Sequence, residues 1–393
     1  MTDTIASGAP ERLDGPTTPA PIPGARVDIV VPVYNEEVAL APSVRRLHAF
    51  LSAEIPYAWR IVIADNASTD TTPAVARALA FELDRVTAMH LERKGRGRAL
   101  RAAWTASDAD VLCYMDVDLS TDLRALLPLI APLISGHSEV ATGSRLAPGA
   151  RVVRGPKREV ISRCYNHLLR AALRARFSDA QCGFKAIRAD VAGGLLAEVR
   201  DPGWFFDTEL LVLAQRRGLR IHEVAVDWID DPDSRVDIVS TAMADLRGVV
   251  RLLFASPLVR FLTVGVASTI AYAILYLLLR APLGAGGANA VALALTAVAN
   301  TQANRRFSFR IRGRAGLVRQ HAAGAVVYLI ALGLTAGALD VLNGLDPHPS
   351  RVLEMVVLVA ATLVATVTRY VALRSWVFGR RRSVPDPLRA IAR

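Results

Sequence analysis

The chain has 393 residues with a formal net charge of +11, and 52% of its residues are hydrophobic. That hydrophobic share is high for a soluble protein. The positive charge belongs to the second half, because residues 258–393 carry 16 basic residues against 4 acidic ones, whereas residues 1–257 are close to neutral. Since no basic surface with interleaved aromatic residues is visible, we expect no nucleic-acid partner.

Residues 1–24 are rich in Pro, Thr, Ala and Gly and lack the hydrophobic core of a signal sequence. Such a composition cannot bury enough apolar surface to fold, so we predict a disordered tail rather than an export signal. The folded part is therefore expected to begin at about residue 25.

Between residues 25 and 237, short apolar runs alternate with amphipathic helical patterns. Continuously apolar strands separated by helices predict a mostly parallel sheet that is covered on both faces. The predicted strands are RVDIVVPVY, RIVIADN, RVTAMHLE, DVLCYMDVD and EVATGSR, and the predicted helices start near Glu36 and in TTPAVARALAFEL, GRGRALRAAWTA and DLRALLPLIAPLIS.

Polar residues directly follow several of these strands. Asn35 and Glu36 follow the first strand, Asp65 ends the second, and Asp116 and Asp118 follow the fourth. In parallel sheets ligands bind at the carboxyl ends of the strands. We therefore expect these side chains along one edge of the sheet.

Asp116 and Asp118 are two carboxylates separated by one residue. Alternate residues of a strand face the same way, so both are expected to point into one crevice. Carboxylates this close repel unless a cation shares their charge, which predicts a Mg²⁺ or Mn²⁺ site. The alternative is an acidic helix cap, which we accept for Asp122 and reject for the pair.

The second half contains four apolar segments. Phe261–Leu279, residues 281–304 and residues 322–339 are uncharged and long enough to cross a hydrocarbon core of about 30 Å as helices. Residues 355–368, extended by residues 371–373, form a shorter fourth segment. We predict an all-α transmembrane domain of four helices over residues 258–380, preceded by an interfacial helix over residues 238–257.

The distribution of arginine predicts the orientation of this domain. Six Arg lie between the second and third segments, and Arg380, Arg381 and Arg382 follow the fourth. By the positive-inside rule, both termini and the central basic loop face the cytoplasm. The predicted location is the plasma membrane, crossed several times, with a basic cytoplasmic tail over residues 381–393.

Several motifs occur in the order and spacing of a known family. VDIVVPVYNEE, IADNASTD, KGRGRAL, MDVDLSTD, GSR and QCGFKA resemble glycosyltransferase family 2, and within it the dolichol-phosphate or polyprenyl-phosphate sugar synthases. RFLTVGVAS, NTQANRRFSFR and LRSWVF resemble the four-helix GtrA-like membrane domain. The resemblance implies an α/β GT-A domain, with a Rossmann-like mostly parallel sheet, over residues 25–237, fused to a GtrA-like domain over residues 258–380.

The resemblance also implies a reaction. A hexose, glucose before mannose, would pass with inversion from UDP-glucose or GDP-mannose to polyprenyl phosphate at the cytoplasmic membrane face, with Mg²⁺ or Mn²⁺ as cofactor. The product would serve as a sugar donor for envelope glycans or glycoproteins. The acceptor needs positioning more than deprotonation, because a phosphate monoester has its second pKa near ~6. This interpretation is compatible with homo-oligomers.

Finally, the resemblance suggests roles for individual residues. Catalytic roles are expected for Asp118, Asp207, Arg145 and Arg158. Nucleotide-sugar binding is expected for Pro32, Asn35, Glu36, Asp65, Asp116, Lys94 and Arg98. Acceptor-phosphate binding is expected for Arg158, Ser162, Lys185 and Arg235, and metal binding for Asp116 and Asp118.

Several of these residues have simpler alternatives. Asp207 at the start of a helix would complement the helix dipole, Lys94 and Arg98 would be solvated loop charges, and Lys185 a solvated residue on a buried strand. The basic stretch GPKREVISR would contact anionic lipids.

Two other functions are compatible with the sequence. A processive polysaccharide synthase is disfavoured, because the QxxRW signature of such synthases is missing. A lipid-carrier translocase or scaffold would use the membrane domain and leave the first half only to bind. The intact Asp-x-Asp pair argues against a catalytically inactive first half.

Overall fold

The computed structural model describes residues 20–230, residues 238–308 and a few separate positions between 322 and 364. It divides into two compact units, Met1–Leu252 and Leu253–Arg393. Residues 1–19 of the predicted tail, Arg235, most of the third and fourth apolar segments and the basic C-terminal tail lie outside the described residues.

The first unit is an α/β domain built on a seven-stranded sheet of order β3-β2-β1-β4-β7-β5-β8. All its strands run in one direction except β7, which is antiparallel to both of its neighbours. This confirms the predicted mostly parallel sheet. The strands are β1 (Arg26–Val33), β2 (Ala58–Asp65), β3 (Val86–His90), β4 (Val111–Met115), β5 (Val140–Ser144), β7 (Phe184–Arg188) and β8 (Ile221–Ala225).

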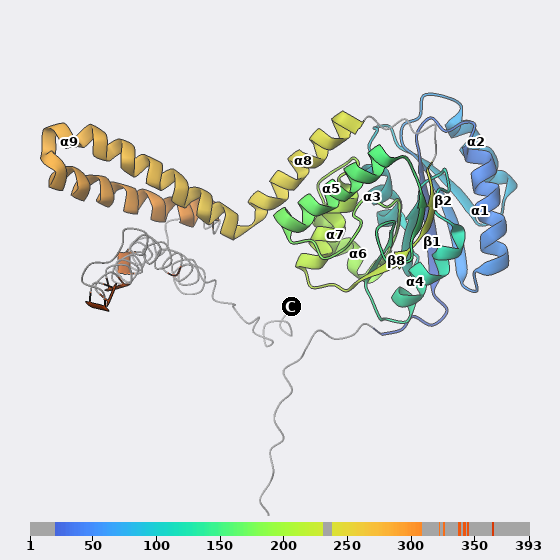
Figure 1. Cartoon of the computed structure of the whole chain (residues 1–393). Helices are drawn as coiled ribbons and strands as arrows, with labels where there is room; N and C mark the ends of the chain where they lie inside the picture. Colours follow the sequence, from blue (N-terminus) through green and yellow to red (C-terminus); the bar gives the residue numbers. More distant parts are fainter. Residues whose placement is uncertain are drawn as a thin grey trace, which may run out of the picture. The chain divides into compact units, whose positions relative to one another are not determined.

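Helices cover both faces of this sheet (Figure 1). On one face α1 (Leu40–Glu54), α2 (Thr72–Glu82) and α4 (Leu126–Ile134) share a hydrophobic core with β1, β2 and β4. On the other face α3 (Arg96–Ala106), α6 (Ala189–Glu198) and α7 (Phe206–Arg216) pack against one another. Covering on both faces explains why the strands read as continuous apolar runs.

The first helix begins at Leu40 rather than near Glu36. The backbone N–H groups of Asn35 and Glu36 instead donate to the hydroxyls of Ser68 and Thr72, at 2.9 and 2.8 Å. These bonds fasten the end of β1 to the loop after β2. The polar ends of the two strands are thereby held together.

A small second sheet was not predicted from the sequence. It consists of β6 (Arg151–Val153) and β9 (Asp227–Ile229), which pair in parallel. An isolated antiparallel bridge joins Thr121, in the loop after β4, to Trp228 on β9. The second sheet therefore lies beside the predicted metal-binding loop, and α5 (Pro156–Leu173) follows β6.

Helix α8 (Ile238–Ala255) covers most of the predicted interfacial segment. Val249 and Leu252 on this helix are buried, whereas Met243, Leu246 and Val250 are 44–47% exposed. One face of α8 thus packs and another presents apolar side chains to the outside. Its position at a membrane surface stays a prediction.

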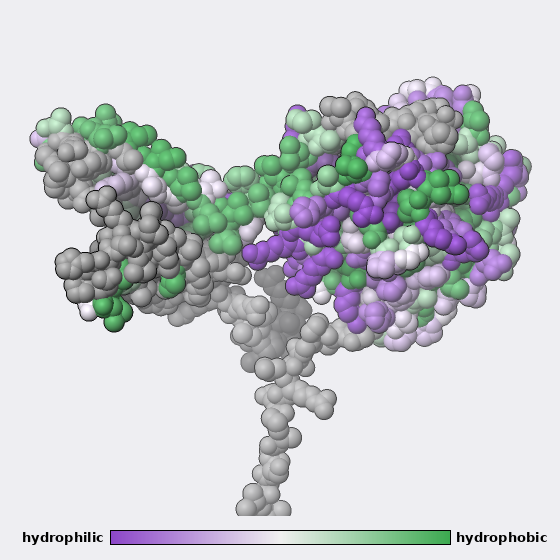
Figure 2. Space-filling view, viewed as in Figure 1, coloured by the Kyte–Doolittle hydropathy of each residue, from purple (hydrophilic) through white to green (hydrophobic). Residues whose placement is uncertain are grey.

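The second unit contains α9 (Pro257–Ala303), in which Pro257–Leu279 has a mean hydropathy of 2.0. Among the described residues, this is the stretch long and apolar enough to cross a membrane. The first predicted segment and all but the last residue of the second fall within α9, which contains Pro282 and bends back on itself in Figure 1. Figure 2 shows hydrophobic residues along α9. The predicted count of four helices stays untested.

Candidate active site

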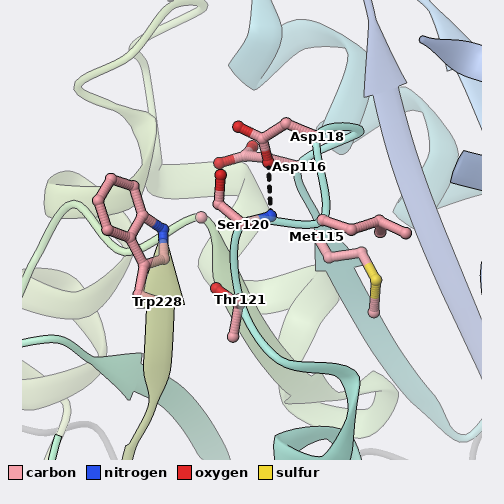
Figure 3. Close-up of a pocket in the computed structure, with 8 residues that line it drawn as sticks. Met115, Asp116, Asp118, Ser120, Thr121 and Trp228 are labelled. Carbon is pink, nitrogen blue, oxygen red and sulfur yellow. Dashed lines mark hydrogen bonds between the residues drawn. The ribbon is translucent and has the colours of Figure 1, made fainter. Parts of the chain in front are cut away.

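The centre of the site is the loop that follows β4. Asp116 to Leu119 form a turn in which the Leu119 N–H donates to the Asp116 carbonyl at 3.2 Å. The two aspartates therefore do not share a strand face, contrary to the prediction, because the strand has already ended at Met115. Both nevertheless line one pocket (Figure 3). The other lining residues are Met115, Leu119, Ser120, Thr121, Gly183 and Trp228.

The two carboxylates differ in their surroundings. Asp118 is exposed, and one of its oxygens accepts a hydrogen bond from the Ser120 N–H at 3.0 Å. Asp116 is half-buried, and its Oδ1 accepts a hydrogen bond from Arg96 Nη2 at 2.7 Å. A β-carbon built on Gly183 would lie 1.6 Å from Asp116 Oδ2. Glycine at position 183 is therefore required by the close approach of Asp116, rather than by a tight turn.

These residues fit a divalent cation that shares its ligands with a substrate. Mg²⁺ prefers oxygen ligands, and protein sites often supply one or two carboxylates while phosphates and water complete the shell. The pocket offers two carboxylates and the hydroxyls of Ser120 and Thr121. Over the described ranges, no group of three or more His, Cys, Asp or Glu side chains could hold a metal by itself.

Arg96, at the start of α3, was missed by the sequence analysis. It is buried and joins two acidic groups, since Nη1 donates to Asp207 Oδ2 and Nη2 to Asp116 Oδ1, each at 2.7 Å. Its guanidinium also lies 4.9 Å from the ring centroids of Tyr114 and Trp204. Burial opposes its charge, but Asp116 and Asp207 raise the pKa of Arg96 above its ordinary value.

Flanking glycines were the signal that could have identified this arginine. A β-carbon on Gly95 would lie 2.6 Å from the Pro202 carbonyl oxygen, and one on Gly97 would lie 2.6 Å from Phe206 Cβ. The glycines allow the start of α3 to press against the segment leading into α7. In the motif KGRGRAL the residue between these two glycines is Arg96, and its side chain is buried.

Asp207 is enclosed by donors. Its side chain is 4% exposed, Tyr114 donates its hydroxyl to Oδ1 at 2.5 Å, and Lys185 Nζ lies 3.9 Å away. Burial, and then the charge of Asp207, raise the pKa of Tyr114 well above its ordinary value. Asp207 is not among the residues that line the pocket. Both Asp207 oxygens have partners in the interior, and the predicted catalytic role stays a prediction.

Lys185 and Arg145, which are both predicted to meet phosphate, have partners inside the protein. Lys185 is fully buried, and its Nζ donates to the Cys182 carbonyl at 2.5 Å. Arg145 forms a two-pronged ion pair with Asp179, at 2.7 and 3.1 Å. Burial alone would raise the pKa of Asp179, but the charge and hydrogen bonds of Arg145 lower it to about 2. Both side chains are engaged by protein groups, and their predicted contact with a substrate phosphate stays a prediction.

The predicted nucleotide-binding residues gather at the ends of β1, β2 and β3. Asp65 is buried, and its oxygens lie 3.2 Å from the Ser68 N–H nitrogen and 2.5 Å from His90 Nδ1. Asn35 adopts a positive φ of 55° and accepts a hydrogen bond from the Thr69 N–H at 2.8 Å. Pro32 and Glu36 are half-buried, and so is Arg98 on α3. The Nζ of Lys94 lies 3.5 Å from the Tyr34 ring centroid.

The capping role predicted for Asp122 is confirmed. Asp122 caps the short 3₁₀ helix at Leu123–Ala125 by accepting the Arg124 N–H at 2.9 Å. Asp70 similarly accepts the Thr72 N–H at 2.9 Å just before α2.

Two of the four predicted acceptor residues, Arg158 and Ser162, lie on α5. Arg158 pairs with Asp230, and its side chain is 34% exposed. Ser162 is buried, and its hydroxyl has no hydrogen-bond partner among the residues that the structure describes. Arg235 lies outside the described residues. The structure thus brings Arg158 and Ser162 onto one helix, places Lys185 on β7 and leaves Arg235 undescribed.

A mostly parallel α/β sheet with an Asp-x-Asp loop at its carboxyl edge is the architecture of the GT-A glycosyltransferases. Sequence comparison then identifies two regions. Residues 28–195 match glycosyl transferase family 2, and residues 260–384 match the GtrA/DPMS transmembrane domain. The first unit is therefore similar to glycosyl transferase family 2, and the second to the GtrA/DPMS transmembrane domain.

The relatives fall into two groups by coverage. Glycosyltransferase AglD of Haloferax volcanii is 42% identical over 221 residues, which are 55% of this chain but 35% of AglD. The chain therefore spans about a third of that relative. Dolichyl-phosphate beta-glucosyltransferase ALG5C of Trichomonas vaginalis is 27% identical over 60% of this chain and 77% of its own length. The Drosophila melanogaster dolichyl-phosphate beta-glucosyltransferase is 29% identical, and the match covers 54% of this chain and 70% of that relative.

Among solved structures, glucosyl-3-phosphoglycerate synthase of Mycobacterium tuberculosis in complex with UDP is similar over 59% of this chain and 80% of its own. The sequence identity is 23% and the TM-score is 0.44.

Proposed function

We propose that the protein transfers glucose, with inversion, from UDP-glucose to polyprenyl phosphate at the cytoplasmic face of the plasma membrane. The observation that carries the proposal is the pocket shared by Asp116 and Asp118, in a chain that also has a transmembrane domain. The names of the relatives support glucose as the sugar and a dolichyl-type lipid phosphate as the acceptor. Their beta products correspond to inversion of an α-linked sugar nucleotide.

The chemistry of the pocket suits this reaction. A Mg²⁺ or Mn²⁺ ion held by Asp116 and Asp118 would neutralise the diphosphate leaving group as a Lewis acid. Arg96 holds Asp116 in place from the interior. The lipid phosphate is already anionic at neutral pH, so an enclosed Asp207 is compatible with a reaction that needs no general base.

The acceptor side follows from α5 and the membrane domain. Arg158, at the start of α5, combines a charged side chain with the positive end of a helix, both of which favour a phosphate. The transmembrane domain would anchor the reaction to the bilayer, with several membrane crossings and both termini in the cytoplasm. The anchoring raises the effective concentration of a lipid acceptor.

The experiment uses the full-length protein in detergent or vesicles with polyprenyl phosphate and either radiolabelled UDP-glucose or GDP-mannose. We expect a lipid-linked glucose product with UDP-glucose that is abolished by EDTA and restored by Mn²⁺ or Mg²⁺. A mannosyl lipid as product would show that the transferred sugar is mannose. A polymeric product would favour a processive polysaccharide synthase. Full activity in EDTA would show that the reaction needs no metal ion.

A further inference from the structure

Trp228 forms the wall of the pocket that faces the aspartate loop. In Figure 3 its indole stands opposite the segment that carries Asp116, Asp118 and Ser120. The side chain is half-buried, so part of the ring remains accessible. No role for this residue follows from the sequence motifs, and its strand β9 was not predicted.

The backbone of β9 is fastened to the aspartate loop at three successive positions. The Asp122 N–H donates to the Asp227 carbonyl at 2.9 Å, and the Ile229 N–H donates to the Ser120 carbonyl at 3.0 Å. Between them Thr121 and Trp228 form the antiparallel bridge. Trp228 is therefore held at a fixed distance from the two carboxylates.

A buried ion pair braces the same ring. The Arg145 guanidinium lies 5.3 Å from the Trp228 ring centroid, within the range of a cation–π contact. Asp179, which is fully buried, fixes that guanidinium through two hydrogen bonds. The ring thus contacts a charge pair whose members are not among the residues that line the pocket.

The chemistry of the residues that line the pocket indicates its occupant. If the carboxylates hold a cation and the diphosphate, the group next to that diphosphate is the hexose. A pyranose has an apolar C–H face that suits an indole and hydroxyls that suit Ser120 and Thr121.

We propose that Trp228 is the platform for the transferred hexose, and that Arg145 and Asp179 are positioning residues that orient its ring. This inference rests on the proposed transfer from a nucleotide sugar. Arg145 can orient the Trp228 ring while it remains paired with Asp179. The inference also gives the unpredicted second sheet a role, because strand β9 places the Trp228 side chain beside the metal-binding loop.

The test compares UDP with UDP-glucose on the full-length protein in Mn²⁺, in the absence of lipid. We expect Trp228→Ala to leave UDP affinity within about 3-fold of wild type and to weaken UDP-glucose affinity about 10-fold, with Trp228→Phe recovering most of the loss. Arg145→Lys, which keeps the charge and loses the fork, should show a smaller loss of the same kind.

Ile229→Ala is the matched control, because Ile229 is the next residue on β9, is 67% exposed and does not line the pocket. It should change neither affinity. Equal UDP-glucose binding by Trp228→Ala and wild type would overturn the inference. If that variant instead raised only the KM for polyprenyl phosphate, the ring would contact the lipid. Failure of the wild type to bind either nucleotide would contradict the proposed function itself.

Discussion

Gly183 faces Asp116 so closely that a β-carbon on the glycine would lie 1.6 Å from the carboxylate oxygen Oδ2. The Asp116 N–H also donates to the Gly183 carbonyl at 3.2 Å, so the two backbones are tied together. Gly183→Ala must therefore displace the carboxylate. We expect transfer to fall at least ~10-fold, a barrier increase of about 1.4 kcal/mol, together with a higher Mn²⁺ requirement, measured by metal titration of the transfer rate.

Gly193→Ala is the matched control for this prediction. Gly193 lies within α6, and a β-carbon there would meet nothing within 4 Å. Alanine should stabilise that helix by about 0.5–1 kcal/mol and leave the metal requirement unchanged. If Gly183→Ala kept the wild-type rate and metal requirement, Asp116 would have no part in the chemistry.

Asp118 and Asp122 should respond in opposite ways to the same substitution. Asp118→Asn removes charge from the pocket at constant volume, so we expect transfer to be lost while the fold is retained. Asp122→Asn should keep activity, because asparagine also accepts the capping hydrogen bond from the Arg124 N–H. Circular dichroism and the lipid-product assay measure the two properties. Wild-type transfer by Asp118→Asn would contradict the metal assignment.

The fold of the first unit could be predicted because its strands are buried on both faces. β1 to β5 were all read from apolar runs, and the polar residues after β1, β2 and β4 do meet at one edge. The second sheet was missed because β6 and β9 are three-residue strands, of which Val153 and Ile229 are largely exposed. Strands that short carry no periodicity to detect.

The site was predicted less completely than the fold, because sequence position does not reveal which charges pair with each other. Arg145, Lys185 and Asp207 were assigned to substrate, yet each has its partners inside the protein. Arg96 was passed over for Lys94 and Arg98, although it is the buried member of that motif. Isolated charged residues near a site are thus ambiguous until burial and partners are known.

Asp207→Asn tests whether that carboxylate acts as a base or holds Arg96. Breaking one partner of a buried ion pair typically costs about 3–5 kcal/mol, so we expect a large loss in the free energy of unfolding along with reduced kcat. The shape of the pH–rate profile should stay unchanged, because the acceptor phosphate is already ionised. Glu82→Gln, in the exposed pair with Arg45, is the control and should leave the free energy of unfolding close to that of the wild type. If Asp207→Asn lost the acidic or the alkaline limb of the pH–rate profile, Asp207 would act as a base in the reaction.

Asp245 on α8 should make the packing of that helix depend on pH. Burial, and then the charge of Asp201, raise the pKa of Asp245 to about 7, above the value of about 4 in an unfolded chain. The folded state then binds the proton more tightly, so the free energy of unfolding falls as pH rises from about 4 to about 7 and stays lower above that. Asp245→Asn should flatten this dependence and protect α8 at pH 8.

Hydrogen exchange of α8 amides at pH 6 and pH 8, corrected for intrinsic rates, measures the effect. Asp84→Asn serves as the control, because the Asp84 side chain is 77% exposed. The same loss of protection between pH 6 and pH 8 in wild type and Asp245→Asn would rule out Asp245 as its source.

Arg158 is the described residue best placed to separate acceptor from donor binding. Its side chain is one-third exposed at the start of α5, where it pairs with Asp230. A charge-assisted hydrogen bond is worth about 1.5–3 kcal/mol, so Arg158→Ala should raise the KM for polyprenyl phosphate at least ~10-fold and leave UDP affinity unchanged. The KM of Arg158→Lys for polyprenyl phosphate should lie between those of the wild type and Arg158→Ala, because lysine keeps the charge without the planar fork. Arg170→Ala, exposed in the last turn of the same helix, controls for a general loss of positive charge near lipid. Equal increases in KM for Arg158→Ala and Arg170→Ala would mean that α5 attracts the lipid surface rather than binding the acceptor phosphate.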